Sequence, residues 1–443
     1  MKLLYGLALA LIFFEGFISQ CEGASGSEEA STSINLKNLP NNVYEEILFR
    51  TGFSATEQAA KDNQRSLTAV KKIFEDRIIQ ICPMNWDDEE VREETLDGNI
   101  YLNIYGGDRI LSLFEHFGEL VKKIKIDYEF IDEVDEDIRQ QINENIIKKY
   151  AKQFTEFHII VRGSFLAFLN ELSDGGERIH FPNVKKLVYQ GPNFGNSYDL
   201  NAIFPNLESL NFYYNRFFMS HSVMQINMTC MENVTKLKEL KLEINRHSYI
   251  QRELQHFLAK NKQISTLKIV IADKTDILRS IEAHATNLQT LEIQMDNTDF
   301  LTHVSEEHPF NMPKLKRLNL RGNCDTSRII NFINSFKKLE TLDVWTNNDL
   351  IISNFGKLIE IREFITFDLE IIDFKEILES FGRKKHLNII KWAPVDQFKC
   401  DNYKSEVVEI NKESKQSHKP TWKINYIKEN GYSYGYMMLL RSK

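Results

Sequence analysis

The sequence predicts an α/β solenoid, with a parallel sheet along one side and helices along the other. Two observations support this fold class. A line of apolar residues with the spacing L-x-x-L-x-L-x-x-N recurs along the chain, most clearly at Leu315, Leu318, Leu320 and Asn323. Between the recurrences lie segments with apolar residues at i, i+3, i+4 and i+7, the spacing of an amphipathic helix. A solenoid grows by adding such units, which suits a chain of 443 residues.

The chemistry of the line explains its spacing. The two leucines of L-x-L are two residues apart, so on a short strand both point to one face, into the core. The Asn then turns the chain out of the strand, where its amide can bond backbone groups that would otherwise be buried unpaired. This position is filled by Asn215, Asn245, Asn323 and Asn347, and by Asp296 in one copy.

The recurrences give the expected strands in order. The clear copies begin at Val184, Leu207, Leu237, Ile264, Leu288, Leu315 and Leu339. Neighbouring copies are between 23 residues (Val184 to Leu207) and 30 residues (Leu207 to Leu237) apart. Weaker copies lie at Val121, Ile124 and Ile126, at Phe154, Phe157 and Ile159, at Ile361 and Phe364, and at Leu387, Ile390 and Trp392. We expect a further strand at Leu102 and Ile104, before a helix with Leu111, Leu113 and Phe114.

Three helices are expected between these strands. They contain Ile250, Leu254, Phe257 and Leu258; Ile329, Ile330, Ile333 and Phe336; and Phe374, Ile377, Leu378 and Phe381. Near the end of the chain, residues 422–427 and 432–440 flank Asn430 and Gly431 and predict a β-hairpin. We therefore expect a solenoid over residues 96–394 and a C-terminal cap over 395–443, although that cap could equally be a separate interaction module.

The N-terminus predicts a secretory signal peptide. Lys2 precedes a twelve-residue apolar run, residues 3–14, and small residues near Gly23 and Ala24 offer a cleavage site. A membrane anchor is the alternative, but the run is too short to span a bilayer and Glu15 interrupts it. The expected segments are a signal peptide over 1–23, a disordered leader over 24–37 and a helical cap over 38–95.

The repeated line resembles the leucine-rich repeat, whose known members form horseshoes with a concave parallel sheet and convex helices. The segment before it resembles an F-box, because Leu39 and Pro40 open a helical pattern with Val43 and Ile47. A second line, from Val70 to Phe74, resembles the family's V-C-x-x-W, with Lys71 at its Cys position and Phe74 at its Trp position.

An F-box followed by such repeats is similar to the substrate adaptors of cullin-type ubiquitin ligases, and the similarity covers residues 39 to about 392. It implies an intracellular adaptor whose residues 39–78, including Leu39, Pro40, Val43 and Ile47, bind the ligase's adaptor subunit. A signal peptide contradicts this role, because the ligase is cytosolic. We therefore expect a secreted protein and keep the cytoplasmic adaptor as the alternative.

The cysteines and the glycosylation sequons are also relevant to whether the chain is secreted. Removing the signal peptide leaves Cys82, Cys230, Cys324 and Cys400, which could form two disulfides in any pairing or remain as free buried thiols. Asn227 and Asn233 each begin an N-x-T glycosylation sequon. The acidic stretch from Asp87 to Glu94 is expected to be a solvated surface.

Composition and motifs exclude several functions. A formal net charge of -8 argues against nucleic-acid binding, because phosphate contacts need a basic face. No phosphate-binding loop, zinc-protease helix or hydrolase elbow occurs in the sequence, and His303 and His308 are five residues apart, too far to share a helix face. We expect no enzyme activity, no metal, no cofactor and no stable membrane insertion.

The remaining candidate site is the concave side of the sheet, at the positions that alternate with the leucines. There the sequence places Tyr213, Lys241, Arg317, Arg321, Asp343 and Trp345. Tyr, Trp and Arg dominate the energetics of protein interfaces, although such residues also often only cover their neighbours. The sequence therefore predicts a binding protein for a protein or glycan ligand, contacted on this surface or on the rim loops.

Overall fold

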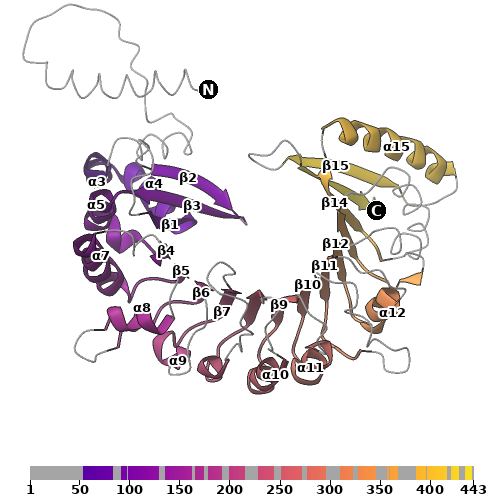
Figure 1. Cartoon of the computed structure of the whole chain (residues 1–443). Coiled ribbons are helices and arrows are strands. Elements are labelled where there is room, and N and C mark those ends of the chain that lie inside the picture. The colour runs from indigo at the N-terminus through magenta and orange to yellow at the C-terminus, as the bar shows by residue number, and fades with distance from the viewer. Residues whose placement is uncertain are drawn as a thin grey trace, which may run out of the picture. The chain divides into compact units, whose positions relative to one another are not determined.

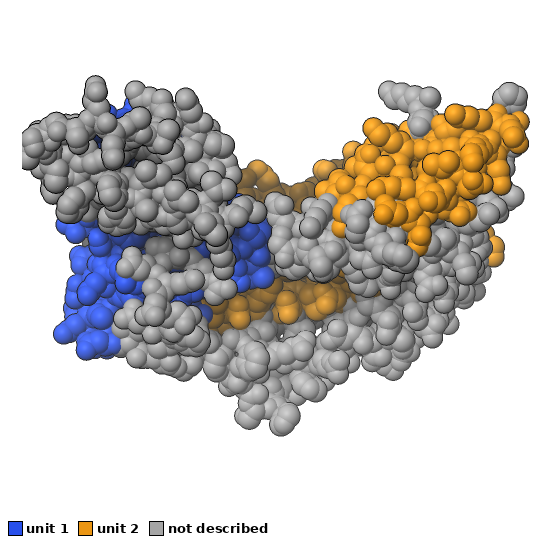
Figure 2. Space-filling view, turned by 90° about the horizontal axis from the view of Figure 1, so that it is seen from above, with its two compact units in different colours: residues 1–154 blue, residues 155–443 orange. Residues whose placement is uncertain are grey.

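The computed structural model describes part of the chain in detail. The described residues are 53–82, 91–96, 98–128, 135–161, 165–173, 178–191, 199–214, 228–243, 251–271, 277–295, 310–322, 328–345, 357–358, 360–367, 386–395, 397–416, 421–428 and 435–441. The chain divides into two compact units, residues 1–154 and 155–443, coloured separately in Figure 2. Each is an α/β unit with an open and mostly parallel sheet.

Unit 1 has four described strands in the order β4-β1-β3-β2. Only the β2 to β3 pairing is antiparallel among them. The strands are β1 (Arg77–Cys82), β2 (Val91–Leu96), β3 (Asn99–Tyr105) and β4 (Lys123–Asp127). The helices are α3 (Phe53–Asp62), α4 (Gln64–Asp76), α5 (Gly107–Phe117), η2 (Gly118–Leu120), α7 (Glu136–Ile142) and η3 (Asn143–Lys148), the last a π-helical continuation of α7.

Local sequence explains how helices of unit 1 begin. The side chain of Asn63 caps α4 by accepting a hydrogen bond from the backbone N–H of Arg65 at 2.8 Å. Helix α4 then buries Val70, Ile73 and Phe74 on one side. Between β3 and α5 the chain turns at Gly106, whose φ of 86° is a left-handed conformation that glycine adopts without strain.

Unit 2 continues the same alternation over a longer sheet, in the order β15-β16-β14-β13-β12-β11-β10-β9-β8-β7-β6-β5. The strands from β5 to β14 are parallel and follow one another in chain order. They are β5 (Glu156–Ile160), β6 (Lys186–Gly191), β7 (Ser209–Tyr214), β8 (Glu239–Glu243), β9 (Thr266–Ile271), β10 (Thr290–Met295), β11 (Arg317–Gly322), β12 (Thr341–Trp345), β13 (Glu363–Phe367) and β14 (Ile389–Val395).

Helices of unit 2 lie together on one side of these strands, as Figure 1 shows. They are α8 (Phe165–Glu171), α9 (Leu200–Ile203), η5 (Thr229–Met231), α10 (Gln251–Lys260), α11 (Ile277–His284) and α12 (Arg328–Ser335). The strands face them with two buried positions per strand, such as Leu318 and Leu320 of β11, which are 0% and 1% exposed. The intervening residues of each strand therefore point to the opposite face.

A backbone ladder joins successive strands at their start. The N–H groups of Lys316 and Arg317 both donate to the carbonyl of Gln289, at 2.8 and 2.9 Å. Those of Glu340 and Thr341 donate to the carbonyl of Lys316 in the same way, at 2.7 and 2.9 Å. Because the pattern repeats, the register is the same from strand to strand, and equivalent residues form rows across the sheet.

The C-terminal end of unit 2 closes the parallel series with a helix and an antiparallel hairpin. Helix α15 (Gln397–Gln416) precedes β15 (Trp422–Lys428) and β16 (Gly435–Arg441), and β16 pairs with both β15 and β14. The β14 pairing shifts register between Trp392 and Val395, at Pro394, which has no N–H to donate. Asn411 of α15 holds β15 by accepting from the N–H of Trp422 and donating to its carbonyl, both at 2.8 Å.

The structure confirms the α/β class, the expected strands and the hairpin pairing. It differs from the sequence prediction in the range 38–95, expected to be a helical cap, because β1 and most of β2 lie within it. The apolar run of β1 is buried in a parallel sheet and so lacks the alternation that marks a half-exposed strand. The helix expected at Phe374 to Phe381 and the Asn positions of the repeated line lie outside the described residues.

Candidate functional site: the polar face of the sheet

The common register of unit 2 brings the six predicted site residues to one face of the sheet. They occupy rows that alternate with the buried leucine rows on β7, β8, β11 and β12. We call this side, which lies opposite the buried leucines, the polar face. The structure groups the six residues into two sets, which are Tyr213 with Lys241 and the four residues Arg317, Arg321, Asp343 and Trp345.

Tyr213 and Lys241 form a pair between β7 and β8. The Lys241 ammonium donates to the Tyr213 hydroxyl at 2.6 Å and lies 4.4 Å from the centroid of the same ring. A cation so close to an aromatic ring is attracted by the ring's negative face. The Lys241 ammonium and the Tyr213 hydroxyl are therefore engaged with each other and are less available to a ligand.

Arg321 and Trp345 stack between β11 and β12, where they are direct register partners. The Arg321 guanidinium carbon lies 4.8 Å from the Trp345 ring centroid. The indole Nε1–H donates to Oδ1 of Asp343 at 2.6 Å. The carboxylate thus fixes the indole, and the fixed indole supports the guanidinium of Arg321.

Asp343 is the buried acid of this set. Its side chain is only 7% exposed, and Nη2 of Arg317 lies 3.9 Å from Oδ2, the one ion-pair contact that the described residues give it. Burial raises the pKa of Asp343, and the hydrogen bond from Trp345 and the charges of Arg321 and Arg317 only partly oppose it. The negative charge of Asp343 is therefore incompletely compensated.

Sequence reasoning did not select three further residues of the same face. Glu292 of β10 forms an ion pair with Lys268 of β9, and its Oε1 lies 3.4 Å from Nε of Arg321. Asn319 of β11 is 5% exposed, and its Oδ1 accepts no hydrogen bond among the described residues. All three residues stand in the row between the leucines, a signal that the sequence did contain. Only the strand register brings them to Arg321 and Asp343.

We call the seven residues of this region the β9–β12 cluster. Its members are Lys268, Glu292, Arg317, Asn319, Arg321, Asp343 and Trp345. Arg321 is the centre of the cluster, since it contacts Glu292 on one neighbouring strand and Trp345 on the other. Its side chain still is 35% exposed. The cluster can therefore present guanidinium N–H groups outward from a fixed position.

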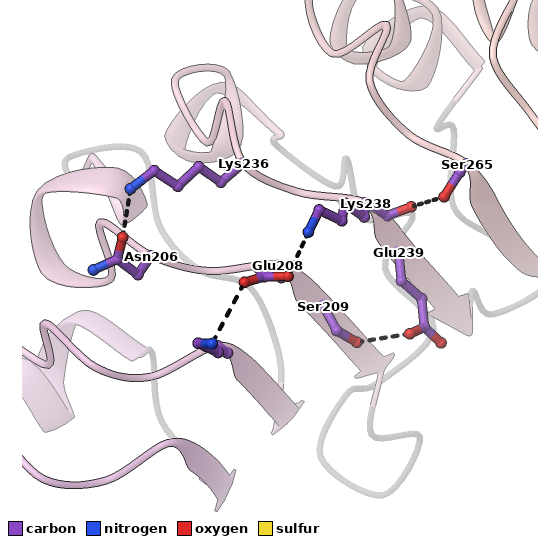
Figure 3. A network of polar contacts seen from close by, with 8 residues as sticks. Asn206, Glu208, Ser209, Lys236, Lys238, Glu239 and Ser265 are labelled. Atoms are coloured by element: carbon purple, nitrogen blue, oxygen red, sulfur yellow. Dashed lines mark hydrogen bonds and ion pairs between the residues drawn. The ribbon is translucent and has the colours of Figure 1, made fainter.

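A second polar network lies at the strand starts and, unlike the β9–β12 cluster, consists of exposed side chains (Figure 3). Glu208, just before β7, contacts Lys238 at 2.7 Å and Lys185 at 3.9 Å. The two lysine side chains are 64% and 65% exposed. The hydrogen bond from Lys238 lowers the pKa of Glu208. Exposed pairs of this kind contribute little, so we assign this network to the repeat architecture and not to a site.

Two of the four disulfide candidates are free thiols in the structure. Burial raises the pKa of Cys82 to about 11 and that of Cys230 to about 12, so both thiols are protonated and weakly reactive at neutral pH. Cys324 lies outside the described residues, and the side chain of Cys400 is not described.

The structure describes one of the two sequon asparagines. Asn233 is exposed beside η5, and its Nδ2 donates to Oδ2 of Asp199 at 3.4 Å. Asn227 lies outside the described residues. The Asn233 side chain is thus accessible to a modifying enzyme.

Other predictions concern residues that the structure does not describe. These are the signal peptide and leader, the F-box-like positions Leu39, Pro40, Val43 and Ile47, and the pair His303 and His308. Within the described ranges, no helix is long and apolar enough to cross a membrane. Nor does that part of the chain hold a group of three or more His, Cys, Asp or Glu side chains suited to a metal ion.

A comparison with protein-family models found no match for this chain, and neither did a comparison with curated proteins.

Proposed function

We propose that this chain is a secreted leucine-rich-repeat binding protein that recognises a protein ligand through the polar face of unit 2. The observation that carries the proposal is the β9–β12 cluster, where Trp345, Arg321 and Asp343 meet on adjacent strands. A partly exposed Arg supported by a Trp is the residue combination found at interface hot spots. In this proposal the polar face is the concave side of a horseshoe, and no catalysis takes place.

A binding measurement on two variants tests the proposal. We expect the double variant Arg321→Ala/Trp345→Ala to keep the fold and secretion of the chain and to bind an identified partner at least tenfold more weakly. The matched control is Arg362→Ala, because Arg362 is also an Arg of unit 2 but directly precedes β13, 3.7 Å from Glu340 and 68% exposed. Equal losses in both variants, or no loss in the double variant, would contradict the site.

Secretion is tested separately by expressing the full chain in a eukaryotic cell. We expect protein in the medium with a first residue near Ala24. Enzymatic deglycosylation should lower its mass, and Asn233→Gln should remove part of that shift because Asn233 is exposed. A cytosolic product that retains Met1 would contradict secretion.

The alternative is an intracellular F-box-type adaptor of a cullin-type ubiquitin ligase. Two observations favour this alternative. Helices α3 and α4 lie within the F-box-like segment, and Cys82 and Cys230 are free thiols. A reducing compartment keeps thiols in this state. Co-purification of the full chain with a cullin complex, lost on mutation of Leu39 and Pro40, would support this alternative over secretion.

A further inference from the structure

The β9–β12 cluster has unused hydrogen-bonding capacity of a specific kind. Arg321 has five N–H donors, and its contacts are an ion pair at 3.4 Å to Glu292 and the stack on Trp345. Its Nε donates no hydrogen bond to any residue that the structure describes. Arg317, four residues earlier on β11, is 48% exposed, and among the described residues its one ion-pair contact is that to Asp343 at 3.9 Å. Strand β11 therefore carries two guanidinium groups with donors to spare.

The described lysines of the polar face, unlike the two arginines of β11, each have a close partner. Lys186 and Lys391 each contact a glutamate of a neighbouring strand, at 2.6 and 2.7 Å, and Lys268 contacts Glu292. Lys241 donates to Tyr213. Excess positive charge is thus concentrated at β11 rather than spread over the sheet. The ionised members of the β9–β12 cluster are Lys268, Arg317 and Arg321 against Glu292 and Asp343, a net charge of +1.

From this arrangement we infer that the ligand presents a carboxylate side chain, from Asp or Glu of a peptide segment, to Arg321, with Arg317 as a second cation four residues away on β11. A guanidinium pairs with a carboxylate through two parallel N–H···O bonds, a geometry that lysine cannot reproduce. Arg321 is already held by Trp345 and Glu292, so little side-chain entropy is lost on binding.

A peptide fits better than an acidic glycan. Sugars bind aromatic side chains through an open ring face, whereas the Trp345 ring carries the Arg321 guanidinium. A sulfated polymer requires a run of free basic groups, and the described lysines of this face are engaged. The inference rests on the proposed function and specifies the class of ligand at the same site.

The test is selection of binders from a random peptide library displayed on phage, with the full chain as the target. We expect selected peptides to share an Asp or Glu whose change to Asn or Gln weakens binding at least tenfold. We also expect Arg321→Ala and Arg321→Lys to weaken binding by a similar factor, with Arg317→Ala weaker in effect and Arg362→Ala without effect. Thermal unfolding of each variant establishes that the fold is intact, and Arg321→Lys retains the charge if Arg321→Ala disturbs packing.

The outcomes separate the inference from the proposed function. Peptides that need Trp345 but contain no essential carboxylate would overturn the inference and leave the binding face in place. Peptides unaffected by Arg321→Ala, Arg321→Lys and Trp345→Ala would overturn both. Binding of a sulfated oligosaccharide in competition with the acidic peptides, but stronger than theirs, would assign the site to a glycan and overturn the inference.

Discussion

Two carboxylates on the polar face of unit 2, the partly buried Glu156 and the buried Asp343, have opposite environments. Glu156 of β5 lies 2.7 Å from Nε2 of His158 and 2.6 Å from Nζ of Lys186. Burial raises the pKa of Glu156, but the hydrogen bonds and charges of His158 and Lys186 outweigh it and lower the pKa to about 2. Asp343 of β12 has a neutral indole as its close donor, and its pKa is raised, chiefly by burial.

The opposite pKa directions of Glu156 and Asp343 distinguish a carboxylate that stabilises the fold from one that belongs to a binding site. A carboxylate with a lysine and a histidine at hydrogen-bond distance is stabilised within the chain and has little left to offer a ligand. A buried charge whose nearest cation is at 3.9 Å remains sensitive to any group that approaches its arginines. We therefore assign Glu156 to the stability of the sheet and the region around Asp343 to binding.

Replacing the structural carboxylate should have the largest effect on stability. We expect Glu156→Gln to lower the free energy of unfolding by about 2–3 kcal/mol at pH 7, because the lowered pKa means that the folded chain stabilises the ionised form. The loss should be present above the ordinary pKa of 4.5 and should shrink as the pH falls toward about 2. Chemical unfolding of both proteins at pH 7 and pH 3 measures it, and a loss that is independent of pH would contradict the assignment.

The indole donor of Asp343 should have the next largest effect. Trp345→Phe keeps an aromatic ring beneath Arg321 but removes the N–H that Asp343 accepts at 2.6 Å. A buried acceptor without its donor costs about 1–2 kcal/mol, and we expect a loss of that size in the free energy of unfolding. The paired variant Trp345→Phe/Asp343→Asn should recover part of the loss. Additive effects would mean that the two side chains are not coupled.

Neutralising Asp343 alone should cost no stability at pH 7. A raised pKa in the folded state means that the ionised carboxylate is destabilising above that pKa, and this penalty disappears as the pH falls toward the ordinary value of 3.8. Asp343→Asn should therefore unfold at the same temperature as the unmodified chain or higher at pH 7, with the difference shrinking in acid. Calorimetry over this pH range checks the sign. A marked loss of stability at pH 7 would show that Asp343 is a structural ion-pair partner like Glu156.

The smallest effect is expected at the strand starts. Glu208→Gln removes an exposed partner of Lys238 and Lys185, and we expect no measurable change in melting temperature at physiological salt. A clear decrease would show that the network in Figure 3 holds the repeats together, contrary to its assignment here.

The fold was largely predictable because each repeat encodes its own strand. Residues such as Leu318 and Leu320 alternate with polar neighbours, and this period is visible in a single sequence. Helix α15 was not predicted, since its residues are mostly polar and carry little amphipathic pattern. Its buried Tyr403, packed against Trp392 with ring centroids 5.1 Å apart, and the hydrogen bonds of Asn411 with Trp422 tie it to the sheet.

The site was predictable in part. Residue type identified Arg321 and Trp345, but their neighbours Glu292 and Lys268 have no special type. Their role depends on the register between strands of different repeats, which no single repeat encodes. The opposite pKa directions of Glu156 and Asp343 likewise follow from cross-strand partners rather than from local sequence.

The most direct test is a carboxyl NMR titration of Glu156 and Asp343 in the full chain, with and without a peptide selected for binding. We predict that the free chain shows Glu156 titrating near 2 and Asp343 above 3.8, and that the peptide raises the pKa of Asp343 further by placing a second negative charge near Arg317 and Arg321. Glu156 should not respond. A peptide that shifts the Glu156 resonance and leaves Asp343 unchanged would contradict the assignment of the binding site.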